Sequence, residues 1–227
     1  MIYLLVLTIL IIILAPSIWV KFTIKKYSKP QTNIPGTGGE FARHLVKQFN
    51  LTGIEVEKGE PNQDHYSPLE KCIRLSPEIY DGKSISAVAI AAHEVGHAIQ
   101  YQLDEPIVKL REKYTPIAYI VEKIAIGLVS ICPLLVIIFK LPQLVVLSII
   151  AGIMAMLISV LLQLIILPME WDASFNKALP ILEAGEYLDN RDIPAATTIL
   201  RAAAMTYVAA TLSSLLNVWR WLAILRR

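Results

Sequence analysis

Charged residues and cysteines are scarce in this chain of 227 residues. Only 18% of the residues are charged and 55% are hydrophobic, whereas ordinary soluble domains carry about 25% charged residues. Of the two cysteines, Cys72 lies in a polar segment and Cys132 in an apolar one, and neither belongs to a CxxC pair. These shortages exclude a disulfide scaffold and a thiolate metal site, and they argue against an ordinary soluble globular protein. A net charge of only +2, with no run of Lys and Arg, excludes a nucleic-acid partner.

Four blocks of the chain contain no formal charge: residues 1–20, 124–139, 141–169 and 202–219. A helix needs about 20 apolar residues to cross a bilayer. We therefore expect residues 1–20 to form an uncleaved N-terminal transmembrane anchor, since no Lys or Arg precedes residue 21 and no good cleavage site follows. Residues 117–169 are expected to form a transmembrane helical hairpin. The last block fits either an amphipathic helix packed at the interface, which its basic flank favours, or a further span.

The distribution of basic residues predicts the orientation of the chain. Thirteen of the 21 Lys and Arg residues lie in residues 21–116, directly after the first apolar block. Because basic residues concentrate on the cytosolic side, residues 21–116 and 170–201 are expected to share the cytosolic face. The lipid bilayer is then a partner of the chain.

Between the apolar blocks, the pattern predicts a mixed α+β domain. Helices are expected over residues 36–49 and 84–103, and short strands over 54–57 and 71–75, where apolar and polar residues alternate. A helix over 170–185 is expected to kink at Pro180, and a last helix begins at 194–201.

The predicted helix over 84–103 contains His93-Glu94-Val95-Gly96-His97, which is an H-E-x-x-H motif. The i, i+4 spacing puts the two imidazoles on one helix face, about 5–6 Å apart at Cβ, so that His93 and His97 can bind one ion. Glu94 is placed to act as general base toward a water on that ion. Burying three such groups without partners is costly, and a zinc ion satisfies them together.

A catalytic zinc usually has a third protein ligand. Glu170 is the favoured candidate because it opens the next helix on the same predicted face, although a carboxylate there also fits a helix-dipole partner. The alternatives from spacing are Asp172, Glu183 and Glu186. His44 is interpreted as a surface residue, and His65 is a weaker candidate for a ligand or a substrate contact.

Three motifs together resemble a known family. AIAAHEVGHAIQ at 89–100, DHYSP at 64–68 with KCIRLS at 71–76, and EWDAS at 170–174 resemble the bacterial membrane-bound "putative neutral zinc metallopeptidase" (YugP-like) family over essentially the whole chain. EWDAS also resembles the third-ligand helix of membrane zinc peptidases of the HtpX and CAAX-protease type, which implies that Glu170 is the third ligand.

The resemblance implies a fold and a location. We expect a mainly α membrane protein of the bacterial inner membrane, with its peptidase domain facing the cytoplasm. Its four parts are the anchor (1–20), a zincin-like half that contains HEVGH (21–116), the helical hairpin (117–169), and the third-ligand helix with the C-terminal apolar helix (170–227).

The expected activity is hydrolysis of peptide bonds in a peptide or protein substrate, with one catalytic Zn²⁺. Tyr207, Arg201 and His65 are candidate oxyanion donors. Two alternatives stay open. The first is an intramembrane metalloprotease, which is disfavoured because only nine charge-free residues, 84–92, precede the motif. The second is a non-catalytic metal-binding scaffold, which has no need of Glu94.

Overall fold

The computed structural model describes residues 2–139, 143–185, 187–206 and 208–209. The chain divides into two compact units. The first consists of Met1–Ser17, Leu110–Leu167 and Tyr207–Arg227, and the second of Ile18–Lys109 and Pro168–Thr206. Every strand and most of the short helices belong to the second unit, which also holds the H-E-x-x-H motif.

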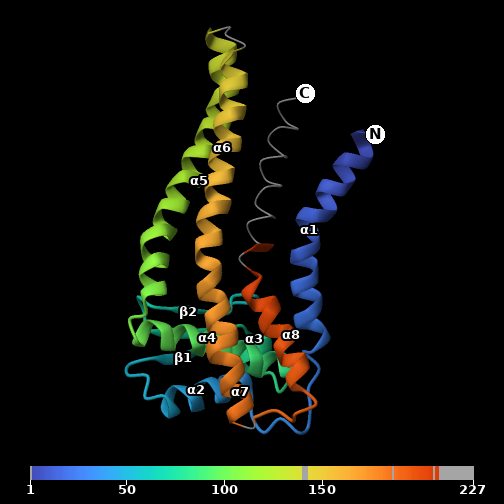
Figure 1. The fold of residues 1–227 in the computed structure, drawn as a ribbon, viewed down its shortest axis with the longest axis vertical. Helices are drawn as coiled ribbons and strands as arrows, with labels where there is room; N and C mark the ends of the chain where they lie inside the picture. Colours follow the sequence, from blue (N-terminus) through green and yellow to red (C-terminus); the bar gives the residue numbers. More distant parts are fainter. Residues whose placement is uncertain (1, 140–142, 186, 207, 210–227) are drawn as a thin grey trace. The chain divides into compact units, whose positions relative to one another are not determined.

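Helices dominate the described residues (Figure 1). In chain order they are α1 (Ile2–Lys26), α2 (Gly38–Gln48), α3 (Pro77–Tyr80), α4 (Ile85–Gln102), α5 (Pro106–Phe139), α6 (Gln143–Trp171), the π-helix η1 (Asp172–Ala178), α7 (Leu179–Ala184) and α8 (Ile193–Ala204).

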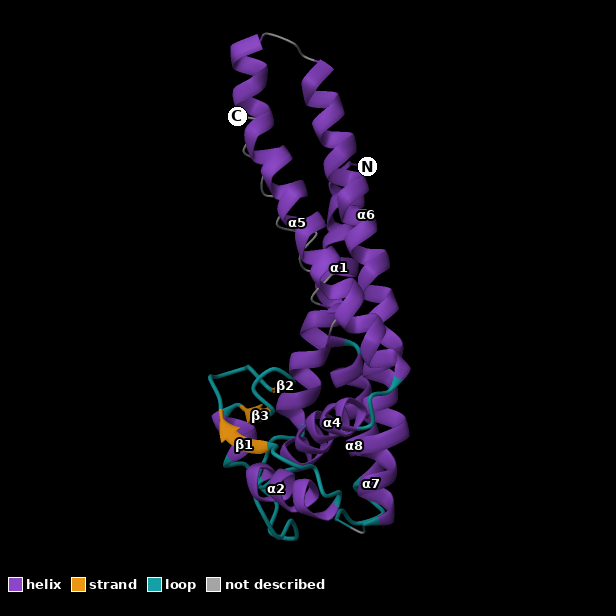
Figure 2. Ribbon diagram, turned by 90° about the vertical axis from the view of Figure 1, so that its left-hand side faces the viewer, coloured by secondary structure: helices purple, strands orange, loops and turns teal. Residues whose placement is uncertain are grey.

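A small three-stranded sheet lies in the second unit (Figure 2). It consists of β1 (Glu55–Lys58), β2 (His65–Ser67) and β3 (Cys72–Leu75) in the order β1-β3-β2. β1 pairs with β3 in parallel, and β2 pairs with β3 in the antiparallel sense. β2 is therefore an edge strand, and it packs against α4.

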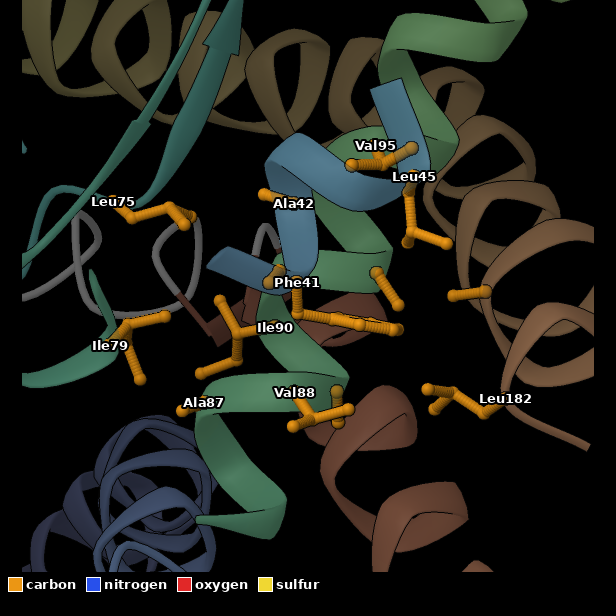
Figure 3. Close-up of a cluster of buried hydrophobic side chains, with 14 of the residues drawn as sticks. Phe41, Ala42, Leu45, Leu75, Ile79, Ala87, Val88, Ile90, Val95 and Leu182 are labelled. Atoms are coloured by element: carbon orange, nitrogen blue, oxygen red, sulfur yellow. The ribbon is translucent and has the colours of Figure 1, made fainter. Parts of the chain in front are cut away.

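Helix α4 is the centre of the hydrophobic core of the second unit. Nearly all of its residues are buried, and it packs against α2, η1 and α8. Figure 3 shows the cluster of buried side chains around it, contributed by α2, α3, α4, α7 and the end of β3. A helix that is apolar on every side belongs in a core, so the sequence AVAIAA, which precedes His93, carries the motif into the interior.

The ends of α4 follow from local chemistry. The Ser84 hydroxyl accepts a hydrogen bond from the Ala87 N–H at 3.1 Å, which caps the first turn. The helix ends at Leu103, and Asp104 then adopts a left-handed φ of 48° before Pro106 begins α5. These two ends hold the H-E-x-x-H residues in the middle of a regular helix.

The predicted helix over 170–185 is divided in the structure. Glu170 lies at the end of α6, and residues 172–178 form the π-helix η1, after which α7 continues with Pro180 in its first turn. π-helical turns are rare and are often found at functional sites. Here the turn follows directly after the candidate third ligand.

The prediction of membrane-spanning segments is wrong for the part of the chain that the structure describes. No helix there combines the length and the low polarity that a crossing requires, so neither the N-terminal anchor nor the transmembrane hairpin over 117–169 is supported. The prediction counted charge-free blocks, and such a block is not by itself a span. In α5 the charge-free part is only residues 124–139, shorter than the about 20 residues that a bilayer needs.

The predicted C-terminal apolar helix is likewise not supported as a crossing helix among the described residues. Residues 202–204 end α8, and most of the 202–219 block lies outside the described residues. The division into parts at residues 20, 116 and 169 stays a prediction.

Candidate metal site

Three side chains from distant parts of the second unit meet in the core. His93 and His97 lie one turn apart on α4, and Glu170 comes from the end of α6. The Oε2 atom of Glu170 lies 3.4 Å from His93 Nε2 and 3.2 Å from His97 Nε2. All three residues are buried, and their potential ligand atoms lie within 4.8 Å of one another.

The donor set fits a zinc ion. Two imidazole nitrogens and one carboxylate form a known catalytic set, with bond lengths of about 2.0–2.2 Å. Tetrahedral coordination at such lengths separates the ligand atoms by about 3.3–3.6 Å, and the two separations from Glu170 Oε2 lie near the lower end of this range. The side chains are thus arranged around a volume of the size of one ion.

The hydrogen bonds of His93 determine its tautomer. Ser174, in η1, lies with its Oγ 3.0 Å from His93 Nδ1 and donates its only proton to the Leu200 carbonyl at 3.0 Å. The hydroxyl oxygen can then only accept from the imidazole, so Nδ1 carries the proton. In its neutral form, His93 therefore has the Nε2 lone pair that a metal ion requires, on the side that faces Glu170.

The same reasoning applies to His97. Gln100 Nε2 donates to the Met169 carbonyl at 3.0 Å and to the Asp172 carboxylate at 2.7 Å. Because both of these groups only accept, the amide nitrogen is assigned to that side, and the amide oxygen faces His97 Nδ1 at 2.9 Å. Nδ1 therefore carries a proton, and the neutral form of His97 likewise has its Nε2 lone pair toward the centre.

The two buried carboxylates have opposite electrostatic environments. Burial raises the pKa of Glu94 to about 7, opposed by attraction to His93 and by a hydrogen bond from the Tyr66 backbone N–H. For Glu170, burial acts in the same direction, but in the metal-free site attraction to His97 and hydrogen bonds from imidazoles that carry a proton on Nε2 as well outweigh it and hold the pKa well below its usual range. Glu170 is thus an anion at neutral pH.

Gly96, inside the motif, allows η1 to approach α4. A Cβ atom at this position would lie 2.8 Å from the Ala173 carbonyl oxygen. Carbon–oxygen contacts normally begin at about 3.3 Å. The absence of a side chain at Gly96 therefore brings the segment that carries Ser174 and Asp172 within reach of the two histidines.

The other candidates are placed away from the centre. Asp172 contacts Gln100 instead of the histidines, and Glu183 is exposed. His44 is on the surface, as predicted, with its ring 2.9 Å from the Tyr187 hydroxyl. Glu186 lies outside the described residues.

The three candidate oxyanion donors lie in different surroundings, and none of the described ones is seen to point at the metal site. His65 lies in β2 opposite Arg74, and it is the backbone of the next residue that contacts Glu94. Arg201 is exposed in the last turn of α8. Tyr207 lies outside the described residues.

A family model described as "Putative neutral zinc metallopeptidase" matches residues 2–226. The chain belongs to this family. A relative in Bacillus subtilis (strain 168), with the name "Putative membrane protease YugP", is 36% identical over 222 residues, which cover 92% of this chain and 91% of the relative. No solved structure matches the chain. In a zinc metallopeptidase family, the buried His93, His97 and Glu170 cluster fits a zinc ion.

Sequence reasoning missed the residues around the ligands in this family member. The sequence analysis assigned no function to Ser174, although it lies in the EWDAS motif, and none to Gln100. Spacing marks both as neighbours of a candidate ligand, since Ser174 follows Glu170 by four residues and Gln100 follows His97 by three. It does not reveal that Ser174 contacts His93 from a distant part of the chain. β2 was also missed because its three residues lie among turn-forming residues.

Proposed function

We propose that this chain is a zinc-dependent peptidase in which His93, His97 and Glu170 hold the ion and Glu94 is the general base. The observation that carries the proposal is the convergence of two Nε2 lone pairs and one ionised carboxylate on a single buried point, next to a further carboxylate. A structural zinc site is usually closed by four protein ligands. Three ligands are the number found in catalytic sites, which leave one position for water or substrate.

A bound zinc ion supplies Lewis-acid chemistry, polarising a water and the carbonyl of the scissile bond. Glu94 is buried directly after the first histidine on α4, and its carboxylate interacts electrostatically with His93 and Glu170, so it lies near the proposed ligands. There it takes a proton from the attacking water and gives that proton to the leaving amine. The hydrogen bond from the Tyr66 N–H orients the carboxylate for both transfers.

The test separates binding of the metal from cleavage. We expect Glu94→Gln to retain zinc at the wild-type level and to lose cleavage of a casein or peptide substrate, because the amide cannot accept the proton. Glu183→Gln, at an exposed position, is the matched control and should cleave normally. Equal cleavage by the Glu94 variant and the wild type would refute the mechanism. An inactive wild type that binds zinc would favour the non-catalytic metal-binding scaffold.

The third ligand has its own test. Glu170→Ala removes one of three donors, so zinc measured in the purified variant should fall far below one ion per chain. Glu183→Ala, at an exposed position, is the matched control and should retain zinc. Full zinc occupancy in the Glu170 variant would move the third ligand to another residue.

We also propose that the chain works at a membrane, with the metal site on the cytoplasmic side. The support is the name of the B. subtilis relative and the concentration of Lys and Arg in residues 21–116. The chain should sediment with the membrane fraction of lysed cells, and trypsin should cleave residues 21–116 in lysed cells but not in intact spheroplasts. A chain recovered in the supernatant would contradict this location.

A further inference from the structure

The hydrogen bonds around His97 continue beyond its direct partner into a chain of buried polar groups. We propose that Gln100, held by Asp172, is a positioning residue that fixes the tautomer of His97 and ties together the two segments that carry the zinc ligands. This inference rests on the proposed function, since it assumes that His97 and Glu170 bind one ion. It concerns residues that contact the ligands and not the ion itself.

Gln100 is a fully buried polar side chain in a core helix. A buried amide is costly unless its hydrogen bonds are made. Here the oxygen accepts from His97, and the nitrogen donates both of its protons, to Met169 O and to Asp172. One side chain thus contacts a ligand on α4 and the backbone carbonyl directly before the ligand Glu170.

Only an amide of this length can make this set of contacts. A glutamate would still accept from His97 but would direct an oxygen at two acceptors, and a leucine would make none of the bonds. Without an acceptor at Nδ1, the His97 ring is free to exchange tautomers and to rotate. Loss of such outer partners typically weakens metal binding about 10–100-fold.

Asp172 is itself fixed on its far side. Its carboxylate accepts from Lys177 at 2.9 Å and from Asn176 at 2.7 Å, and Lys177 also pairs with Glu105 at 2.8 Å. Lys177 is only 12% exposed, so this ion pair is shielded from solvent. The geometry of His97 is therefore held by a path of side chains that ends at the junction of α4 and α5.

The His93 side offers an internal comparison. Ser174 accepts from His93 and donates to a backbone carbonyl, and no charged side chain takes part in these bonds. The two histidines are thus held by independent partners. Weakening one partner leaves the other ligand in place, which allows the contribution of Gln100 to be measured separately.

The experiment measures the affinity of the purified full chain for Zn²⁺ alone, by competition with a chromophoric chelator. Gln100→Leu should raise the dissociation constant about 10–100-fold. Gln102→Leu, an exposed residue on the same helix, is the matched control and should not change it. The absorption spectrum of the Co²⁺-loaded chain should also change in the Gln100 variant, because it reports ligand geometry, which a general loss of stability does not alter.

A double-mutant cycle tests whether the two residues act together, and its Asp172→Ala variant keeps the inference testable if Gln100→Leu folds poorly. Asp172→Ala removes the acceptor behind Gln100 at a more accessible position and should raise the dissociation constant several-fold. Because the two residues act through one path, the double variant should bind zinc no more weakly than Gln100→Leu. Additive losses, or an unchanged affinity in both single variants, would overturn the proposal.

The two failures are distinguishable. If Glu170→Ala binds zinc as well as the wild type, the proposed function is at fault. If Glu170→Ala loses zinc but Gln100→Leu binds as tightly as Gln102→Leu, the metal site stands and only the positioning role is refuted.

Discussion

Gly96→Ala tests whether the close approach of η1 to α4 is needed for metal binding. The new Cβ would lie 2.8 Å from the Ala173 carbonyl oxygen, and relief to an ordinary contact of about 3.3 Å requires a displacement of about 0.5 Å. That displacement exceeds the tolerance of about 0.2 Å in metal–ligand distances. We therefore expect zinc affinity to fall about 10–100-fold, as it does when an outer partner is lost.

The effect on stability has two opposing parts. Overpacking lowers the free energy of unfolding by about 1–3 kcal/mol. The higher helix propensity of alanine relative to glycine raises it by about 0.8–1.0 kcal/mol. The variant should therefore be about 0–2 kcal/mol less stable to unfolding than the wild type.

Gly127→Ala in α5 is the matched control, because a Cβ atom at that position would have no neighbouring atom within 4 Å. It should gain about 1 kcal/mol in the free energy of unfolding from helix propensity alone and bind zinc normally. Chelator competition and thermal unfolding measure both quantities. If Gly96→Ala binds zinc as tightly as the control and is equally stabilised, the close approach is not a constraint.

Three further predictions concern stability and reactivity. Zinc at a hundred times its dissociation constant should add about 2.7 kcal/mol to the free energy of unfolding. Removing the zinc with a chelator should therefore lower the melting temperature by about 5–10 °C. An unchanged melting temperature would contradict binding of zinc to the folded state. Thr37→Ala removes the capping box that Thr37 forms with Glu40 at the start of α2. It should lower the free energy of unfolding, measured by chemical denaturation, by about 1 kcal/mol. Thr52→Ala, at an exposed position, is the control and should lower it little. Burial and a neighbouring glutamate raise the pKa of Cys72 to about 11. In a Cys132→Ser background, alkylation of Cys72 at pH 8 should therefore be about a hundred times slower in the folded chain than in denaturant, and it should accelerate as the pH rises. Rapid labelling of the folded chain would refute this prediction.

The three candidate ligands were predictable from the sequence to different degrees. His93 and His97 are four residues apart in a helix, and this local spacing fixes their relation whatever the rest of the chain does. Glu170 is 73 residues from His97, and spacing alone left Asp172, Glu183 and Glu186 open. The structure brings Glu170 to the histidines, which is the position that the resemblance implied.

The surroundings of the ligands could not be derived in the same way. The roles of Gln100 and Ser174 depend on the π-helical turn at 172–178 and on the approach permitted by Gly96, and both are tertiary features. Hydropathy was misleading in another way. It identified long helices over much of 117–169, where α5 and α6 are found, but the absence of formal charge was taken as evidence of membrane crossing, which the described helices do not support.

The distance along the chain between the candidate ligands has a consequence during synthesis. At about 5–20 residues per second, a ribosome that has made His97 needs roughly 4–15 s to reach Glu170. Leu200, whose carbonyl holds Ser174 against His93, is made later still. A nascent chain therefore has the H-E-x-x-H motif well before it can complete the proposed zinc site, and the proposed activity has to wait until Glu170 and Leu200 have been made.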